Sequence, residues 1–351
     1  MRGIKIVDLN TLKNNYLAVK KRVGGKRVIS VIKADAYGHG GAEVAKKLDA
    51  DDGYAVATLD EAVEVKSAIR ESIPVLILGA TDTEEKRECV ERGIEFTLSD
   101  EKEVAGVLSI TARSDKCARV HIAVNTGMNR LGADWQNPAY KLINRCKNEK
   151  SIRLCGAFTH FYDAADISEC GTQYERFKFA ARTLPEELAH ISSTCAIKFP
   201  EFHCGGVRLG LGLYGYGIEG VSPCMSIKCR VAAVNPLSAG ETVGYGKSYT
   251  AKKRQFVAVL SMGYADGVPR NFSGEVLIGG KRRKIVGKAC MDMCFALVDG
   301  RVKAGDETVF IGRQGAEYID GEEFAANCGG IVYEALTGFR RIKREYIGKT
   351  P

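Results

Sequence analysis

Long apolar stretches are missing from this 351-residue sequence. None of them approaches the roughly 18 consecutive apolar residues that a membrane-spanning helix requires. The opening segment, MRGIKIVDLN, also lacks the apolar core and the small-residue cleavage site of a secretory signal. We therefore expect a cytoplasmic protein that has no membrane partner.

Paired cysteines and nucleic-acid motifs are missing as well. The twelve cysteines are scattered without a CxxC pair, and several lie inside apolar stretches. This distribution predicts reduced, buried thiols rather than a disulfide framework or a metal site. The net charge is +8, but the basic clusters at 252–254, 281–284 and 340–344 have no interleaved aromatic residues. We predict no nucleic-acid partner, and the charge suits a mild attraction for small anions.

The N-terminal two thirds of the chain alternate between strand-like and helix-like patterns. Candidate strands lie near 28–33, 53–58, 74–79, 94–98, 118–124, 152–159, 188–193 and 205–209. Helical patterns between them include 41–51, 59–71, 84–93, 100–114, 138–147 and 172–184. Parallel strands need helical crossovers and a barrel closes at eight strands, so we predict an α/β fold with a TIM (β/α)8 barrel over residues 1–225. A doubly wound open sheet is the competing architecture.

The pattern changes near residue 226. The segments that follow are strand-like and separated by glycine-rich turns, and a helical period returns only at 321–336. This pattern of strand-like segments and glycine-rich turns predicts a second, mostly β domain over residues 226–351. The length of the chain agrees, because a single hydrophobic core rarely extends beyond about 300 residues.

Lys33 occupies an informative place at the end of the first candidate strand, before the turn Ala-Asp-Ala-Tyr-Gly-His-Gly. A lysine there can form a Schiff base with a carbonyl cofactor, and Tyr37 can reach the phosphate of that cofactor. Taken alone, Lys33 is more simply explained as a solvated lysine on a strand-to-helix loop.

Other polar residues also follow the predicted strands. They are Asn125, Met128 and Arg130 after the fifth strand, His160 after the sixth, Ser193 and Thr194 at the seventh, and Arg208 at the eighth. Each has a structural alternative, such as a surface ion pair for Arg130 or a buried core position for His160. In a barrel, however, chemistry gathers at the C-terminal ends of the strands, so the shared placement favours a common pocket.

Seven segments of the sequence resemble the alanine racemase family, whose members are fold-type III enzymes that use pyridoxal 5′-phosphate (PLP). They are VIKADAYGHG at 31–40, NTGMNRLG at 125–132, THF at 159–161, VRLGLGLYG at 207–215, VGYGKSY at 243–249, GYADGVPR at 263–270 and GKACMDM at 287–293. The segments follow the order of the family and extend through both predicted domains.

The resemblance implies two acid/base residues. Lys33 holds PLP as an imine and serves as the base on one face of the substrate α-carbon, and Tyr245 serves on the opposite face. The chemistry agrees, because racemisation removes a proton from one side and returns one on the other, while PLP is the electron sink. Lysine and tyrosine have free pKa values of about 10, so desolvation of the lysine and nearby positive charge must lower them.

The resemblance also implies the binding residues. Arg208 bonds the pyridine nitrogen and, being a donor only, cannot protonate it. Arg130 steadies the phenolic oxygen of the cofactor and the substrate side, and His160 joins the network around Arg208. The remaining implied cofactor contacts are Tyr37, Ser193, Thr194, Gly210 and Leu211, and the implied substrate contacts are Tyr264, Met291 and Asp292.

In the family, the residues matching Tyr245, Tyr264 and Met291 enter the active site of the other subunit, which implies a homodimer with shared active sites. The sequence also departs from the family. Ala123 stands where a lysine is usual and Asn125 where an aspartate is common, which removes two potential partners of Arg130. The aromatic gate residue has no clear match, and Arg340 is the candidate for its position.

These observations predict a PLP-dependent racemase of a small amino acid, alanine first, which in a bacterium supplies D-alanine for peptidoglycan. The alternatives are a serine or broad-specificity racemase, a fold-type III decarboxylase and a non-catalytic PLP-binding protein. A decarboxylase should lack the Tyr-Gly segment at 245–246, and a PLP-binding protein should lack the whole second domain.

Overall fold

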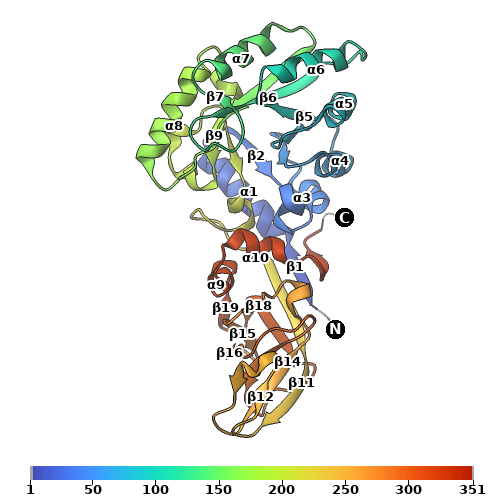
Figure 1. The fold of residues 1–351 in the computed structure, drawn as a ribbon, viewed down its shortest axis with the longest axis vertical. Coiled ribbons are helices and arrows are strands. Elements are labelled where there is room, and N and C mark those ends of the chain that lie inside the picture. Colours follow the sequence, from blue (N-terminus) through green and yellow to red (C-terminus); the bar gives the residue numbers. More distant parts are fainter. Residues whose placement is uncertain (1–2, 350–351) are drawn as a thin grey trace. The chain divides into compact units, whose positions relative to one another are not determined.

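The computed structural model describes residues 3–349, which group into two compact units. One unit comprises residues 12–36 and 40–222, and the other comprises residues 3–11, 37–39 and 223–349 (Figure 1). Residues 3–11 were expected in the barrel, but they contain strand β1 (Ile4–Asp8), which pairs with C-terminal strands. The sequence alone could not show this, because the partners of a single strand lie far away along the chain.

Eight parallel strands of the described chain close into a barrel. The ring runs β2-β3-β4-β5-β6-β8-β9-β10, and β10 pairs back onto β2. The strands are β2 (Arg27–Val31), β3 (Tyr54–Val56), β4 (Val75–Ile77), β5 (Glu95–Leu98), β6 (Ala118–Asn125), β8 (Ile152–Phe158), β9 (Ala189–Ser193) and β10 (Gly206–Leu209), with β7 (Ala133–Asp134) added beside β6. The predicted TIM barrel is confirmed, and closure excludes the open sheet.

Helices of this unit lie outside the strands (Figure 1). They are α1 (Leu9–Arg22, of which residues 12–22 belong to this unit), α3 (Gly41–Leu48), α4 (Leu59–Ala68), α5 (Thr83–Arg92), α6 (Lys102–Thr111), α7 (Pro138–Asn148) and α8 (Ile167–Ala180), with short 3-10 turns at η1 (Glu186–Leu188), η2 (Thr194–Lys198), η3 (Pro200–Phe202) and η4 (Leu211–Tyr214). Local sequence sets their ends, as in α5, where Asp82 and Glu85 bond each other's backbone N–H and Gly93 ends the helix with φ of 63°. Among the described helices, none is long and apolar enough to span a bilayer.

The second unit is mostly β, as predicted. Its sheet has the order β16-β15-β18-β11-β1-β20, with β14 and β17 joined through β11 and with β19 on β18. The strands are β11 (Met225–Leu237), β14 (Gln255–Leu260), β15 (Glu275–Ile278), β16 (Lys281–Lys284), β17 (Cys294–Val298), β18 (Glu307–Gln314), β19 (Glu317–Ile319) and β20 (Lys343–Ile347). A separate hairpin pairs β12 (Thr242–Val243) with β13 (Tyr249–Thr250).

The helical period expected over 321–336 forms two helices rather than one. They are α9 (Gly321–Ala326) and α10 (Val332–Gly338). Between them stand Gly329 and Gly330, and Gly329 has φ of 70°. Consecutive glycines have little helix propensity and readily take this left-handed conformation, so the helix ends before them.

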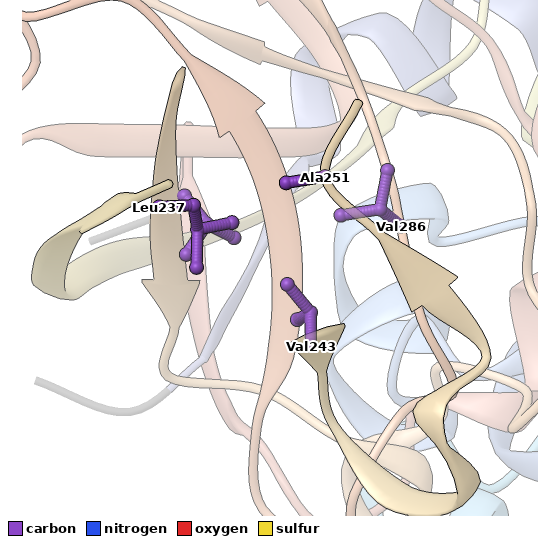
Figure 2. Close-up of a cluster of buried hydrophobic side chains, with 5 residues drawn as sticks. Leu237, Val243, Ala251 and Val286 are labelled. Atoms are coloured by element: carbon purple, nitrogen blue, oxygen red, sulfur yellow. The ribbon is translucent and has the colours of Figure 1, made fainter. Parts of the chain in front are cut away.

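A small buried cluster supports the loop that carries Tyr245 (Figure 2). Its members are Leu237, Val243, Ala251, Val257 and Val286. Val243 ends β12, and Gly244 follows with φ of 69°, where an added Cβ would lie 3.1 Å from Cε2 of Phe295. The chain therefore turns at a position that only glycine occupies easily, and Tyr245 emerges from this base with 66% of its surface exposed.

Candidate active site

Lys33 opens a tight left-handed turn two residues beyond the end of β2. Residues 34–37 all have φ between 52° and 55°, a conformation that costs L-residues roughly 1–2 kcal/mol each. Backbone bonds offset part of this cost. Glu61 in the first turn of α4 accepts from the amides of Ala34 at 2.6 Å and Ala57 at 2.7 Å, and Oδ1 of Asp35 accepts from Gly41 at 2.9 Å. The turn holds the backbone of Lys33 in one position.

The amine of Lys33 lies in a region of positive charge. Burial lowers the pKa of Lys33, Arg130 and Arg208 lower it further, and Glu61 partly opposes them. A lowered pKa increases the fraction of the neutral, nucleophilic amine at neutral pH. This is the direction that both covalent attachment to a carbonyl group and proton abstraction require.

Arg208 is buried on β10, with 3% of its surface exposed. Its guanidinium donates to the carbonyl oxygens of Thr159 at 2.7 Å and Ile191 at 2.9 Å, and to that of His190. It also lies 3.2 Å from Nδ1 of His160 and 3.1 Å from Nδ1 of His190. Burial, and then the charge of Arg130, lowers its pKa to about 9, so the side chain is still a cation at neutral pH.

His160 follows β8 and is neutral at physiological pH. Burial lowers its pKa to about 3, and the charges of Arg208, Arg130 and Lys33 act in the same direction. Because arginine only donates, Nδ1 of His160 accepts from Arg208 and the ring proton lies on Nε2. The four residues form one electrostatically coupled group at the C-terminal end of the barrel strands.

The low pKa of His160 predicts a stability that depends on pH. The unfolded chain binds a proton near pH 6.5 and the folded chain only near pH 3, so the unfolded state holds more protons between these values. The contribution of neutral His160 to the stability of the folded protein is therefore fully present above pH 6.5, and it is lost as the pH falls toward 3. We expect the free energy of unfolding, measured by urea denaturation of the cofactor-free protein, to decrease by up to about 1.4 kcal/mol per pH unit from this histidine.

The matched variant is His160→Asn, whose amide oxygen can replace Nδ1 as an acceptor but cannot be protonated. We expect its stability to change less steeply with pH than that of the parent protein over the same interval. Equal slopes for the two proteins would contradict the assignment of a neutral buried histidine.

A small polar cradle forms where β9 and β10 end. Oγ1 of Thr194 accepts from the amides of Gly210 at 3.2 Å and Gly212 at 3.1 Å. Gly212 is packed so closely that an added Cβ would lie 2.9 Å from a methyl group of Leu209. The predicted residues Thr194 and Gly210 thus lie together, next to Leu211 at the start of η4, and Ser193 is the last residue of β9.

Arg130 has no partner within residues 3–349, where it takes part in no hydrogen bond or ion pair, and its side chain is exposed. Asn125 is engaged elsewhere, because its Oδ1 accepts from the amides of Gly127 at 3.1 Å and Asn129 at 3.0 Å. Ala123 is buried on β6 and offers only a methyl group. Asn125 therefore closes the local turn, and neither Ala123 nor Asn125 forms an ion pair with Arg130.

Five predicted site residues belong to the second unit. Tyr264 and Met291 are 44% and 54% exposed, and Oδ1 of Asp292 accepts from Arg341 at 2.7 Å. The ring of Tyr37 lies 5.8 Å from that of Tyr333, and burial, then the neighbouring phenol, raises the pKa of Tyr37. Tyr245 is the most exposed of the five.

Arg340 also belongs to the second unit, and its Nε donates to the carbonyl of Thr337 at 3.2 Å. Its side chain is exposed, so the structure shows it beside the end of α10 rather than buried in a core. The proposal that it replaces an aromatic gate residue stays a prediction.

Three buried polar residues of the barrel were not predicted from the sequence, namely Glu95, His121 and His190. Each lies on a strand among apolar neighbours and is less than a tenth exposed. The available signal was a charged or polar residue inside an otherwise apolar strand, since such groups are rarely buried without partners.

The fold and this group of residues define a class: two-domain barrel proteins with a lysine at the C-terminal end of a barrel strand. The alanine racemase N-terminal domain model matches residues 7–217 and the C-terminal domain model matches residues 224–346. Alanine racemase of Carboxydothermus hydrogenoformans is 36% identical over 364 residues, which cover 97% of this chain and 98% of that protein. The chain belongs to the alanine racemase family.

Solved structures agree with this assignment. Alanine racemase of Clostridium difficile 630 has a TM-score of 0.91 at 29% identity, with 100% of this chain and 97% of that chain covered. Alanine racemase of Bacillus anthracis with bound L-Ala-P has a TM-score of 0.90 at 28% identity, with 99% and 95% covered.

Proposed function

We propose that this protein is a PLP-dependent racemase that interconverts L- and D-alanine. One observation carries the proposal: a chain that matches the alanine racemase family over almost its whole length has, at the end of a barrel strand, a lysine whose pKa is lowered by burial and by two arginines. Family membership supports the reaction class, and the lowered pKa of Lys33 supports this lysine as the reactive residue.

The donor set of the barrel suits PLP, which has a carbonyl carbon, a ring nitrogen and a phosphate. Lys33 would bind the carbonyl carbon and Arg208 would face the ring nitrogen. The hydroxyl of Thr194, which accepts from the amides of Gly210 and Gly212, would donate to the phosphate together with the amide of Leu211. When bound, PLP supplies an electron sink for charge at the substrate α-carbon. Arg130 is exposed and unpaired in the described chain, so its guanidinium is available to a carboxylate or phenolate.

Proton transfer requires one group on each face of the α-carbon. Nζ of Lys33 would take and return the proton on one face and Oη of Tyr245 on the other. Tyr245 is 66% exposed on its own unit, and Tyr264 and Met291 are also exposed. These apolar side chains support a homodimer in which the second unit of one subunit completes the site of its partner.

The substitutions around Arg130 favour a second candidate, a racemase of serine or of broader specificity. Arg130 is exposed and forms no bond within the described residues, so its guanidinium is not fixed in a position that suits alanine alone. A decarboxylase fits less well because the Tyr-Gly segment at 245–246 is present.

Exchange of the α-proton in D2O distinguishes these candidates. We expect alanine to exchange fastest when the enzyme is incubated with alanine, serine, lysine and arginine in parallel, with serine slower by a factor on the order of 10², the scale of discrimination against one added hydroxyl. The measurement is the loss of the α-proton NMR signal together with chiral analysis of each product. Faster exchange of another amino acid would replace alanine as the substrate, and release of an amine product would indicate decarboxylation.

A further inference from the structure

A line of buried polar side chains runs through the barrel interior from Arg208 to Glu95. Nη1 of Arg208 lies 3.1 Å from Nδ1 of His190, Nε2 of His190 lies 2.9 Å from Nδ1 of His121, and Nε2 of His121 lies 2.8 Å from Oε2 of Glu95. Arg119 closes the line with two bonds to Oε1 of Glu95, at 3.2 Å and 2.5 Å. The first four residues are no more than 6% exposed.

This line connects the two ends of the barrel. Arg208 is near the C-terminal end of β10, where Lys33 and His160 also lie, whereas Glu95 is the first residue of β5. At the Glu95 end, a pocket of about 390 Å³ opens between the N-terminal ends of the strands, and its lining includes Glu95, His121 and Arg119. One end of the line therefore lies at the proposed cofactor site and the other at the opposite end of the barrel.

The hydrogen bonds of the line have only one consistent direction. Arginine has no acceptor, so Nδ1 of His190 must accept from Arg208 and the proton of that ring is on Nε2. That N–H then donates to Nδ1 of His121, whose own proton must be on Nε2 and donates to Glu95. Both imidazole N–H groups of the line point away from Arg208, and they lead to a carboxylate that only accepts when ionised.

The charges agree with this direction. Burial alone would raise the pKa of Glu95, but its bond with His121 and its ion pair with the cationic Arg119 lower it to about 2, so Glu95 is a carboxylate at neutral pH. Burial, and then His121 and Arg208, lower the pKa of His190 far below its usual range, so that ring is neutral. Among the described residues, Arg208 contacts carbonyls and imidazoles but no carboxylate, so the line to Glu95 is its connection to an anion.

A metal site is the competing interpretation of the lower end. The ligand atoms of Glu95, His121 and Cys155 all lie within 4.8 Å of one another. Both oxygens of Glu95 and both ring nitrogens of His121 are already engaged, and the cationic Arg119 contacts the same carboxylate. A metal ion would have to break these bonds beside a positive charge, so the hydrogen-bonded line is the better explanation.

We propose that Glu95 and His121 are positioning residues, which hold His190 in the tautomer that accepts from Arg208 and so fix the guanidinium at the proposed pyridine-nitrogen site. The catalytic part of this inference rests on the proposed function. The structural part concerns the protein alone, and it can be tested without cofactor or substrate.

Imidazole NMR of the cofactor-free protein tests the tautomers. The sequence has five histidines, so the long-range ¹H–¹⁵N spectrum of the histidine-labelled chain can be assigned by single substitutions. We expect His121 and His190 to be protonated on Nε2 at neutral pH. Glu95→Gln should shift the signals of both rings, because a neutral amide is a weaker acceptor beside Arg119, whereas Glu88→Gln, which removes only an exposed ion pair with Arg92, should leave them in place. A proton on Nδ1 of His190, or unchanged signals in Glu95→Gln, would overturn the inference.

Kinetics and the absorption spectrum of the bound cofactor test the consequence. We expect Glu95→Gln to lower kcat on the order of tenfold with KM nearly unchanged, the usual scale for a supporting hydrogen bond, and to shift the cofactor absorption. His121→Asn keeps an acceptor for His190 but removes the link to Glu95, so it should act in the same direction if Glu95→Gln does not fold. If the parent enzyme racemises alanine while both variants keep its kcat and spectrum, the positioning role is refuted. If the parent racemises no amino acid, the proposed function fails and the tautomer result still stands.

Discussion

Replacing Lys33 with alanine is expected to abolish covalent attachment of the cofactor and to lower turnover by a factor on the order of 10³ or more. The factor is large because the same amine would bind the cofactor and move the proton on one face of the substrate. Borohydride reduction of the holoenzyme followed by peptide mapping should place the label on Lys33 in the parent protein. The turn at 34–37 fixes the backbone rather than the amine, so the substitution should leave the fold intact.

Lys66→Ala is the matched control. Burial also lowers the pKa of Lys66, but its amine donates to the carbonyls of Glu71 at 2.7 Å and Ile73 at 3.2 Å in the segment that follows α4. A lowered pKa alone should therefore not attract the label, and Lys66→Ala should keep both labelling and turnover. A label on Lys66, or on any lysine other than Lys33, would refute the assignment of the cofactor lysine.

The barrel strands could be predicted because a strand buried on both faces is apolar along its whole length. This pattern needs no knowledge of partners, so the stretches near 28–33 and 118–124 were found at almost their observed bounds. Strand β1 could not be assigned in the same way. Its sequence directly precedes the barrel and resembles a first barrel strand. Only the pairing of β1 with β11 and β20 places it in the second unit.

Individual site residues could be predicted from their positions at strand ends, but their interactions could not. Asn125 illustrates the difference. The sequence suggested only a lost partner for Arg130, whereas the structure shows that its side chain closes the turn at 127–129. The left-handed turn at 34–37 could not be predicted either. Alanine, aspartate and tyrosine rarely have positive φ, and no local sequence pattern indicates such a turn.

The line from Arg208 to Glu95 was not predictable for a further reason. Apart from Arg208, its members were not singled out from the sequence, each lies on a different strand, and the bonds join residues as many as 69 positions apart. Hydrophobic pattern predicts which residues face the interior but not which polar atoms meet there. A buried carboxylate and two buried histidines each need a partner, and the closed barrel brings these partners together.

Replacing Tyr245 with phenylalanine is expected to leave cofactor binding intact and to lower turnover in at least one direction by a factor on the order of 10² or more, the usual scale for a lost acid/base group. The ring remains and only the hydroxyl is lost, so the loop that follows Val243 of the buried cluster (Figure 2) should keep its conformation. Racemisation measured from each enantiomer, with α-proton exchange, reports the two directions. Tyr249→Phe is the control from the same hairpin, since it removes only a bond with Gln255 and should retain turnover.

Mixing the two inactive variants tests whether Tyr245 acts in the partner's site. In a dimer of one Lys33→Ala and one Tyr245→Phe subunit, one site would combine an intact Lys33 with an intact Tyr245 delivered from the other subunit. Random exchange of subunits makes half of the dimers mixed, each with one working site, so about a quarter of the parent activity should return. If Tyr245 served its own barrel, every site in the mixture would lack one of the two groups and no activity would return, which would refute the shared site while leaving the two-base chemistry in place.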